Sequence, residues 1–424
     1  MNRTKAPKTT EINDINFVMP SHYELQNGIP VYEYNFDAKD VISIDFIFPA
    51  GTYFQDKPLL ARAVTNTLEE GTKKLNSKEI ANEIDYYGAY LQNSLGNNNM
   101  TFSLVTLTKN LENTFPIFVD IIQNAQFPEK ELKLYLDREK QNHKINMNKV
   151  EVIASREFHK YTLGISMPTP LAQMDDFDKI TSQDCQDFFK KQYRLEDLTI
   201  LISGGNTKQT KRLLETSLGD LKLEQKSKPY EYKEGNYEMK KITIEKKDAV
   251  QSAIRIGKPT INVKHPDFIK AKVLNTLFGG YFGSRLMANI REDKGYTYGI
   301  GSYLQGSKYR GGFGISTEVG KEVTQPALDE IFKEIEIIKT ELVTEEELSK
   351  VKNYMLGSLL NGTDGVFDMM DRFRAVYFNN QPDNYYQKYI QEIKETTPED
   401  ILSLAKKYYT NFTVVVVGSI NESK

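Results

Sequence analysis

Residues 179–193, KITSQDCQDFFKKQY, and residues 198–204, LTILISG, decide the fold, because the same pattern returns near the C-terminus. There residues 395–409 read ETTPEDILSLAKKYY and residues 412–418 read FTVVVVG. In each copy a threonine followed three residues later by an acid begins an amphipathic helix that ends in Lys-Lys. An apolar strand that stops at glycine follows each helix.

A second match lies nearer the start of each half of the chain. Residues 64–71 read VTNTLEEG and residues 273–280 read VLNTLFGG, an offset of 209 positions. The offset between the helix-capping threonines Thr181 and Thr397 is 216 positions. Two independent matches at nearly one offset indicate a tandem duplication, in which each half is one structural unit.

Both halves contain strands grouped together and helices grouped together. We expect strands at residues 28–34, 41–48, 100–107, 253–256, 296–303 and 312–317, and helices at residues 77–86, 111–125, 129–146, 325–339 and 344–360. Grouped elements of this kind predict an α+β fold of two tandem homologous domains, each an antiparallel sheet with helices packed on one face. We place the domains at residues 1–222 and 248–424. Residues 223–247, dense in Lys, Glu and Tyr, are expected to be a charged, solvated linker.

Composition limits the classes of function. The 424 residues are 39% hydrophobic and 27% charged, which is typical of a soluble globular protein. With 55 basic and 58 acidic residues the formal net charge is −3, so we expect no basic surface for nucleic acid. The one cysteine, Cys185, excludes an internal disulfide framework, and its place in an amphipathic helix predicts a buried thiol.

The usual targeting and membrane signals are missing from the sequence. The first 16 residues have no apolar core of the kind that a secretory signal needs, and Pro7 disfavours a transit peptide. No apolar run approaches the roughly 18 residues that a membrane helix requires. We therefore predict a cytoplasmic protein without a membrane span.

Histidine is scarce in this chain. The four histidines are His22, His143, His159 and His265, and no two of them lie within one or two turns of a helix. The sequence therefore contains no helix that presents two histidines to zinc. No nucleophile elbow of a serine hydrolase is present either.

One stretch combines an arginine and a tyrosine in a suggestive way: residues 275–304, NTLFGGYFGSRLMANIREDKGYTYGIGSYL. The pattern predicts a helix that carries Arg291, a turn at Gly295 and a strand that carries Tyr298. A guanidinium and a phenol directed at one pocket suit a peptide backbone or a carboxylate, because both groups donate hydrogen bonds. Residues 291–294 also fit a solvated charge cluster, and the residues alone leave both interpretations open.

Nearly the whole chain, from about residue 23 to residue 419, resembles the pitrilysin/insulinase metallopeptidases. The resemblance is strongest to their short bacterial members and to the mitochondrial processing peptidases. Active members carry His-x-x-Glu-His on a helix after a strand that ends in glycine, with Gly-Thr about five residues further on. In this chain Gly51 and the pair Gly71-Thr72 match these two flanking features.

The motif window is residues 62–66, RAVTN. Arg62 stands at the first histidine position, Thr65 at the glutamate and Asn66 at the second histidine. The distal glutamate ligand of the family would fall near residues 139–143. Because catalytic zinc needs about three protein ligands and a base for its water, the resemblance implies that this chain holds no metal.

The second half of the chain keeps the family pattern. Residues 282–298, FGSRLMANIREDKGYTY, resemble the stretch that bears the family's arginine and tyrosine. By that resemblance Arg291 and Tyr298 are the catalytic pair, which grips the substrate and helps to polarise the scissile carbonyl.

A peptide-binding edge strand is also implied by the resemblance. Residues 87–93, YGAYLQN, match it, so Gly88, Ala89, Tyr90 and Leu91 would be substrate-binding residues. A purely structural edge strand is the alternative.

Together these features imply the non-zinc subunit of a heterodimeric zinc metallopeptidase that cleaves peptides or unfolded polypeptides. The two domains would form a half-shell like that of LuxS and the processing peptidases. This chain would hold no cofactor, and zinc is expected in a homologous partner subunit. The chain alone would be inactive. The alternative is a catalytically inert structural or peptide-binding homologue, either a scaffold like the core proteins of respiratory complexes or a homodimer.

Overall fold

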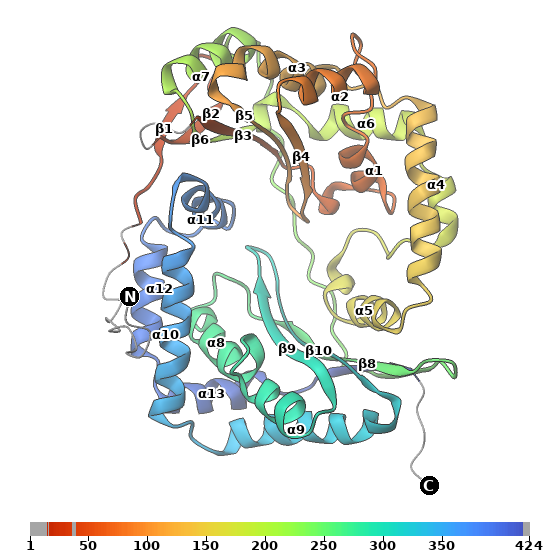
Figure 1. Cartoon of the computed structure of the whole chain (residues 1–424), viewed down its shortest axis with the longest axis vertical. Coiled ribbons are helices and arrows are strands. Elements are labelled where there is room, and N and C mark those ends of the chain that lie inside the picture. Colours follow the sequence, from red (N-terminus) through yellow and green to blue (C-terminus); the bar gives the residue numbers. More distant parts are fainter. Residues whose placement is uncertain (1–14, 16, 36–39, 419–424) are drawn as a thin grey trace, which may run out of the picture. The chain divides into compact units, whose positions relative to one another are not determined.

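The computed structural model describes residues 15, 17–35 and 40–418, with the elements labelled in Figure 1. The N-terminal segment, in which we expect no targeting signal, lies almost entirely outside the described residues.

The chain forms two compact units. The first unit consists of Pro20–Glu238 with the short segment Gly365–Asp371. The second unit consists of Met239–Asp364 and Arg372–Lys424, together with Met1–Met19. Each unit contains one sheet and is described by itself.

The first unit is built on a six-stranded sheet with the order β1-β2-β6-β3-β5-β4. β3 pairs antiparallel with both β5 and β6, whereas β2 and β6 run parallel. The strands are β1 Ser21–Glu24, β2 Pro30–Tyr34, β3 Val41–Phe48, β4 Tyr90–Leu95, β5 Met100–Leu107 and β6 Thr199–Gly204.

The second unit repeats this arrangement in a five-stranded sheet with the order β7-β11-β8-β10-β9. β8 pairs antiparallel with β10 and β11, and β7 runs parallel to β11. Apart from β1, the two sheets therefore share strand order and direction, which confirms the predicted α+β fold of two homologous halves. The strands are β7 Lys241–Glu245, β8 Gln251–Thr260, β9 Thr297–Gly306, β10 Gly311–Gly320 and β11 Thr413–Gly418.

Each sheet also contains one parallel pair, which the prediction of antiparallel sheets did not include. The last strand of each half, β6 or β11, follows a helix and not a hairpin turn. A strand that is reached through a helix is free to run parallel to its neighbour.

In the first half, α3 and α7 lie over one face of the sheet (Figure 1). Among the described helices none is long and apolar enough to cross a bilayer. The helices of the first half are α1 Leu60–Asn66, α2 Ser77–Tyr86, α3 Leu111–Asn124, α4 Glu129–Asn146, α5 Val150–Tyr161, α6 Ser182–Gln192 and α7 Thr207–Leu214. Those of the second half are α8 Phe268–Asn275, α9 Thr324–Thr340, α10 Glu345–Asn361, α11 Val366–Phe378, α12 Tyr385–Glu395 and α13 Pro398–Tyr408.

The two repeated helices begin in the same way. The Thr181 hydroxyl accepts a hydrogen bond from the Asp184 amide at 3.1 Å, and the Thr397 hydroxyl accepts one from the Asp400 amide at 3.2 Å. In return each aspartate accepts from the backbone amide of its threonine, at 3.0 Å in both helices. These capping boxes satisfy amides that a helix N-terminus leaves without partners.

Aromatic rings fill the core between the first sheet and α3. The Phe118 ring lies 4.6 Å from that of Phe46 on β3 and 4.7 Å from that of Phe102 on β5, measured between centroids. Cys185 on α6 is buried in the same core, and burial raises the pKa of its thiol to about 12. The prediction of a buried thiol is thereby confirmed.

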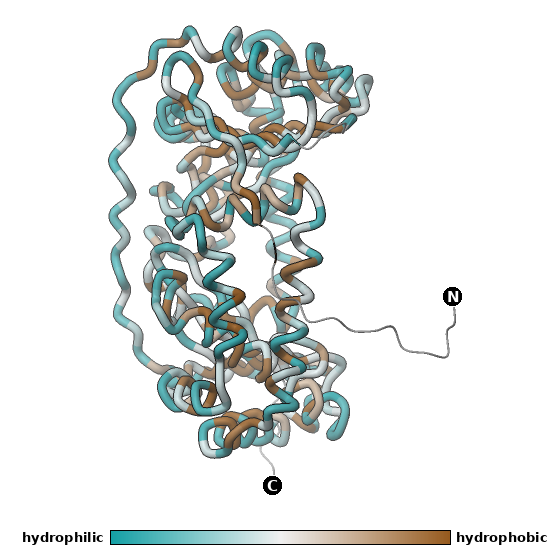
Figure 2. The backbone as a smooth tube through the Cα atoms, turned by 90° about the vertical axis from the view of Figure 1, so that its left-hand side faces the viewer, coloured by the Kyte–Doolittle hydropathy of each residue, from teal (hydrophilic) through white to brown (hydrophobic). Residues whose placement is uncertain are grey.

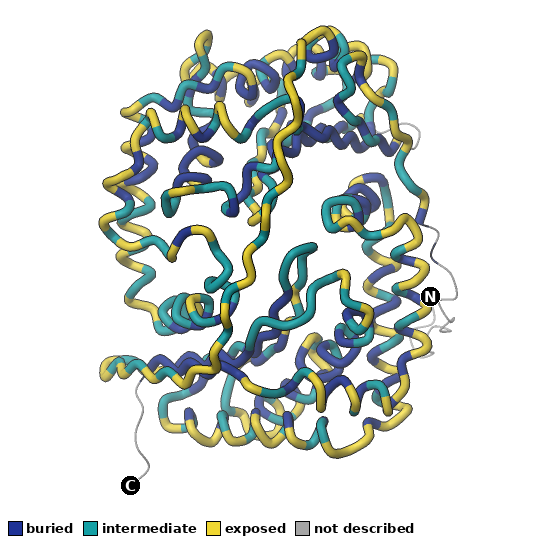
Figure 3. The backbone as a smooth tube through the Cα atoms, turned by 180° about the vertical axis from the view of Figure 1, so that it is seen from behind, coloured by how far each residue is buried: buried dark blue, intermediate teal, exposed yellow. Residues whose placement is uncertain are grey.

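The expected linker is largely exposed and hydrophilic, as Figures 2 and 3 show for the extended segment that follows α7. It is nevertheless not a solvated linker throughout, so that prediction is wrong in part. Its last residues form β7, which pairs with β11. Earlier, the Tyr230 ring stacks on Tyr53 at 5.0 Å and the Gly235 amide donates to Ser166 at 3.0 Å. We did not predict β7 from the sequence because none of its five residues is buried.

The capping boxes give a direct test of the repeat. Thr397→Ala removes the side-chain acceptor at the start of α13, and we expect it to lower the free energy of unfolding by about 1 kcal/mol. Chemical denaturation of the purified chain measures this change. Ser403→Ala is the matched control, because Ser403 is exposed on the same helix and makes no side-chain hydrogen bond within the described residues. Equal effects of the two substitutions would contradict the role of the cap.

Candidate functional site

Helix α1 carries Arg62, Thr65 and Asn66, the three positions at which the sequence led us to expect a replaced zinc motif. Ala61, Ala63 and Val64 are fully buried against the core, whereas Arg62 and Asn66 are exposed. Residues four apart lie on one face of a helix, so the helix presents Arg62 and Asn66 together.

The side chains at two of these positions are engaged within the unit. The buried Thr65 hydroxyl lies 3.4 Å from the hydroxyl of Tyr193. The Asn66 amide donates to the Arg62 carbonyl at 2.9 Å and to the Tyr135 hydroxyl at 3.3 Å. Both residues therefore serve packing and hydrogen bonding within the unit.

A cavity of about 660 Å³, which we call the motif pocket, lies beside these residues in the first unit. Arg62 lines it together with residues from α4 and α5, which include Tyr135, Glu139, His143 and Arg156. The structure thus brings the replaced motif and the region expected for the distal ligand to one cavity.

Electrostatics in the motif pocket is governed by burial and by mixed charges. Burial, and secondarily the Glu139 carboxylate, raises the pKa of the Tyr135 phenol to about 12, while Arg62 opposes the shift. Burial and the positive charge of Arg156 lower the pKa of His143. At neutral pH the pocket therefore contains a protonated phenol and a histidine that disfavours a positive charge.

These residues do not fit a zinc ion. The Arg62 guanidinium has no lone pair to offer and would repel a cation, and Asn66 uses its amide hydrogens on oxygen acceptors. Within residues 15, 17–35 and 40–418, no three His, Cys, Asp or Glu side chains are grouped so that they could hold a metal ion. The described side chains around Arg62 and Asn66 therefore offer no set of ligands suited to zinc.

Arg291 and Tyr298 lie in the second unit, on either side of a turn at Gly295. Arg291 belongs to the π-helical turn Met287–Asp293, and its guanidinium lies 4.8 Å from the centroid of the Phe282 ring. Tyr298 is at the start of β9 and is 93% exposed. Neither polar group forms a hydrogen bond or ion pair with a described residue, and no such bond joins the two. The two residues are seven positions apart in the sequence, and the guanidinium and the phenol can both donate hydrogen bonds to a ligand.

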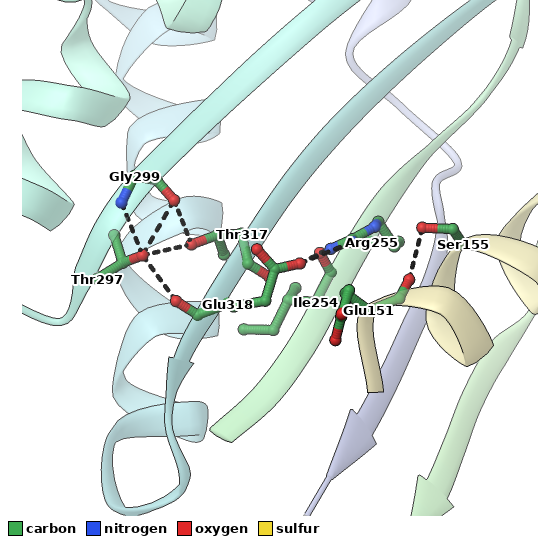
Figure 4. A network of polar contacts seen from close by, with 8 residues as sticks. All are labelled: Glu151, Ser155, Ile254, Arg255, Thr297, Gly299, Thr317 and Glu318. Atoms are coloured by element: carbon green, nitrogen blue, oxygen red, sulfur yellow. Dashed lines mark hydrogen bonds and ion pairs between the residues drawn. The ribbon is translucent and has the colours of Figure 1, made fainter. Parts of the chain in front are cut away.

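A hydrogen-bond network holds the backbone around Tyr298 (Figure 4). The Thr297 hydroxyl donates to the Glu318 carbonyl at 2.7 Å, and the Thr317 hydroxyl donates to the Gly299 carbonyl at 3.0 Å. Here the pairing of β9 with β10 is irregular, between Thr317 and Val319. A bulge of this kind re-aims side chains, and the network keeps Tyr298 directed outward.

Beside the irregular pairing of β9 with β10, Arg255 and Glu318 form an ion pair that we did not predict from the sequence. The Arg255 side chain is nearly buried, and it donates to the Glu318 carboxylate at 2.7 Å and to the Thr317 carbonyl at 3.2 Å (Figure 4). Arg255 lies on β8, two strands away from β9, so only the folded sheet brings it to this site.

β4 lies at the edge of the first sheet and pairs with β5 alone. It begins at Tyr90, so of the four predicted substrate-binding residues only Tyr90 and Leu91 are in the strand. Gly88 has a φ of +61° and forms the turn before it, and Ala89 is buried. A residue in the left-handed region interrupts the extended backbone, so the strand starts three residues later than the resemblance implied.

The two similar sheets and their helices define a duplicated α+β protein of two homologous halves. Residues 60–170 match the family model described as insulinase (peptidase family M16), and residues 179–355 match the model described as peptidase M16 inactive domain. The chain belongs to the insulinase, or M16, family of peptidases, which confirms the resemblance seen in the sequence.

Relatives in this family align with almost the whole chain. An uncharacterized zinc protease of Rickettsia felis is 26% identical, over 94% of this chain and 97% of its own length. The non-peptidase homolog YmxG of Helicobacter pylori is 24% identical, over 95% of each chain. A crystal structure of a peptidase M16 inactive domain from Pseudomonas fluorescens has the same fold, with a TM-score of 0.84 and 21% identity over 96% of this chain and 99% of its own.

The replaced motif predicts how the isolated chain behaves toward zinc. After purification from zinc-containing medium we expect far less than one equivalent of zinc per chain by elemental analysis, because no motif side chain is a competent ligand. Arg62→Ala should not change this result, since it removes the repelling charge but supplies no ligand. Stoichiometric zinc in either protein would contradict this interpretation of α1.

Proposed function

We propose that this chain is the non-zinc subunit of a heterodimeric zinc metallopeptidase. One contrast carries the proposal: Thr65 and Asn66 are engaged within the first unit, whereas the polar groups of Arg291 and Tyr298 have no described hydrogen-bond partner. Because no described residue uses the donors of Arg291 and Tyr298, both groups are free to bind a substrate.

The Arg291 guanidinium is suited to hold a peptide. It is planar, permanently charged and carries five donors, and packing over Phe282 restricts its motion without using those donors. Tyr298 adds a phenolic donor on a backbone fixed by the Thr297 and Thr317 hydroxyls. Donors fixed in advance are what stabilises the charge that develops on a carbonyl oxygen during peptide cleavage.

Zinc would come from a homologous partner that retains His-x-x-Glu-His, so this chain itself would carry no cofactor. Substrates would be peptides or unfolded polypeptides bound in extended form. Edge strand β4 supports this, since its outer side is not paired within the described chain and Tyr90 is exposed. Gly88 and Ala89 would then shape the turn that leads into the strand, and Tyr90 and Leu91 would be the residues beside the peptide.

Co-expression with a zinc-bearing homologue from the same genome tests the proposal. The pair should cleave an unstructured peptide, and this chain alone should not. Arg291→Ala and Tyr298→Phe should lower kcat/KM of the pair by about 100- to 1,000-fold, the range that loss of one such donor commonly costs. The amount of co-purified partner should stay the same.

Tyr86→Phe is the control for Tyr298→Phe, because Tyr86 is likewise a highly exposed tyrosine. The proposal is wrong if the pair assembles and both active-site variants cleave as the unmodified pair does. A chain that purifies as a homodimer or scaffold, and that leaves the activity of the partner unchanged, would instead favour the catalytically inert homologue.

A further inference from the structure

The second unit contains its own cavity, of about 490 Å³, which we call the cationic pocket. Its walls come from α8, the end of β9, α10, α11 and α12, and all its lining residues belong to the second unit. The residues that define its chemistry are Lys272, Tyr354, Arg372, Tyr385, Tyr386 and Tyr389.

The cationic pocket is the counterpart of the motif pocket in the other repeat. Helices α4 and α10 begin 216 positions apart, and so do α5 and α11. At that offset Arg156, which lines the motif pocket, corresponds to Arg372, which lines the cationic pocket. Duplication has therefore produced two cavities with an arginine at the same position.

The acidic and imidazole groups of the motif pocket have no equivalent in the cationic pocket. Glu139 and His143 on α4 are replaced by Met355 and Leu359 on α10, and both of these line the cavity. Among the described residues that line it, Lys272 and Arg372 are the only charged ones, and none is Asp or Glu.

The two cations lack an acidic partner. The Lys272 ammonium lies 5.6 Å from the centroid of the Tyr389 ring and forms no ion pair or hydrogen bond with a described residue. Burial, together with the charge of Arg372, lowers its pKa. Arg372 donates through Nε to the Gly362 carbonyl at 3.1 Å, which leaves its two terminal nitrogens without a described hydrogen bond.

The position of Arg372 is built into the structure. A side chain at Gly362 would collide with Nη2 of Arg372, so the glycine makes room for the guanidinium. The Tyr386 hydroxyl donates to the Arg372 carbonyl at 3.3 Å and ties α12 to α11. Two like charges held in a shared, partly desolvated cavity are unfavourable in the absence of an anion, and they provide complementary charge once one is bound.

Tyrosines supply the remaining features of a ligand site. Burial raises the pKa of the Tyr385 phenol to about 12, so its hydroxyl remains a hydrogen-bond donor at neutral pH. The hydroxyls of Tyr385 and Tyr389 form no hydrogen bond with the described part of the chain. Tyr354 on α10 presents another ring, which is half exposed.

We propose that the cationic pocket binds a small organic phosphate, with the phosphoryl group between Lys272 and Arg372 and the organic part against the tyrosine rings. A phosphate matches two cations in charge and the guanidinium fork in geometry better than a single carboxylate does. The volume lies within the range of small-molecule sites and exceeds what inorganic phosphate alone would fill. This site is separate from the residues proposed to act in peptide cleavage and does not depend on that role.

Isothermal titration of the full chain with phenyl phosphate, benzoate and inorganic phosphate tests the proposal. Phenyl phosphate should bind saturably with one site per chain. Benzoate and inorganic phosphate should each bind at least tenfold more weakly, because one lacks the second negative charge and the other lacks the ring. Lys272→Gln and Arg372→Lys should each weaken phenyl phosphate binding at least tenfold. Lys406→Gln, which removes an exposed charge on α13, should leave it unchanged.

A thermal unfolding measurement separates a ligand site from a structural role. Without ligand, Lys272→Gln should unfold at the same or a higher temperature than the unmodified chain, because it removes a charge that has no acidic partner. Phenyl phosphate should then raise the unfolding temperature of the unmodified chain and not that of the variant. The proposal is overturned if none of the probes binds in a Lys272-dependent way, or if Lys272→Gln lowers the unfolding temperature in the absence of ligand.

Discussion

The pairing of the last strand of each half with two earlier strands is the constraint on which the structure depends. β6 lies between β2 and β3, and β11 lies between β7 and β8, so each binds together strands from the start of its half. All residues of both strands are buried, and each strand follows a helix that begins with the same kind of capping box. Because each of these strands pairs along both of its edges, it sets the register of the strands on either side of it. The residues that line each pocket belong to the same unit as one of these sheets.

The two halves use this shared frame differently. In the first half α1 serves packing: Thr65 contacts Tyr193, Asn66 contacts Tyr135, and Arg62, which we expected at a metal-ligand position, lines the motif pocket. In the second half the family's arginine and tyrosine remain without described partners. Loss of the zinc motif and retention of the arginine and tyrosine would be expected if two homologous subunits shared one reaction. In that case only the residues that contact the substrate would have to be kept.

The two cavities show how a duplicated site changes its chemistry through few positions. Arg156 and Arg372 are equivalent, yet they face opposite surroundings: Glu139 and His143 in one pocket, Met355 and Leu359 in the other. With Met355 and Leu359 in place of Glu139 and His143, Arg372 and Lys272 have no acidic neighbour among the described lining residues, which is the basis for proposing an anionic ligand there. Because a buried charge without a partner is costly, such an arrangement is more readily explained by a ligand than by stability.

The sequence by itself indicated the duplication and the capping threonines Thr181 and Thr397. It also predicted, to within one residue, the bounds of helices α2, α3, α4, α9 and α10 and of strands β3, β5, β6 and β11, whereas α5, α7, α8, α11 and α12 were not predicted. These features are local, since each depends on residue types within one or two turns or at a fixed offset. Only the tertiary structure decided that β7 arises from the expected linker, that the edge strand begins at Tyr90, and that Arg255 supports the Thr317 backbone beside β9. It also decided that Lys272 and Arg372, a hundred positions apart, share one cavity. The reason is physical: pairing of a polar edge strand and convergence of charges both depend on contacts between distant segments, and no local pattern records them.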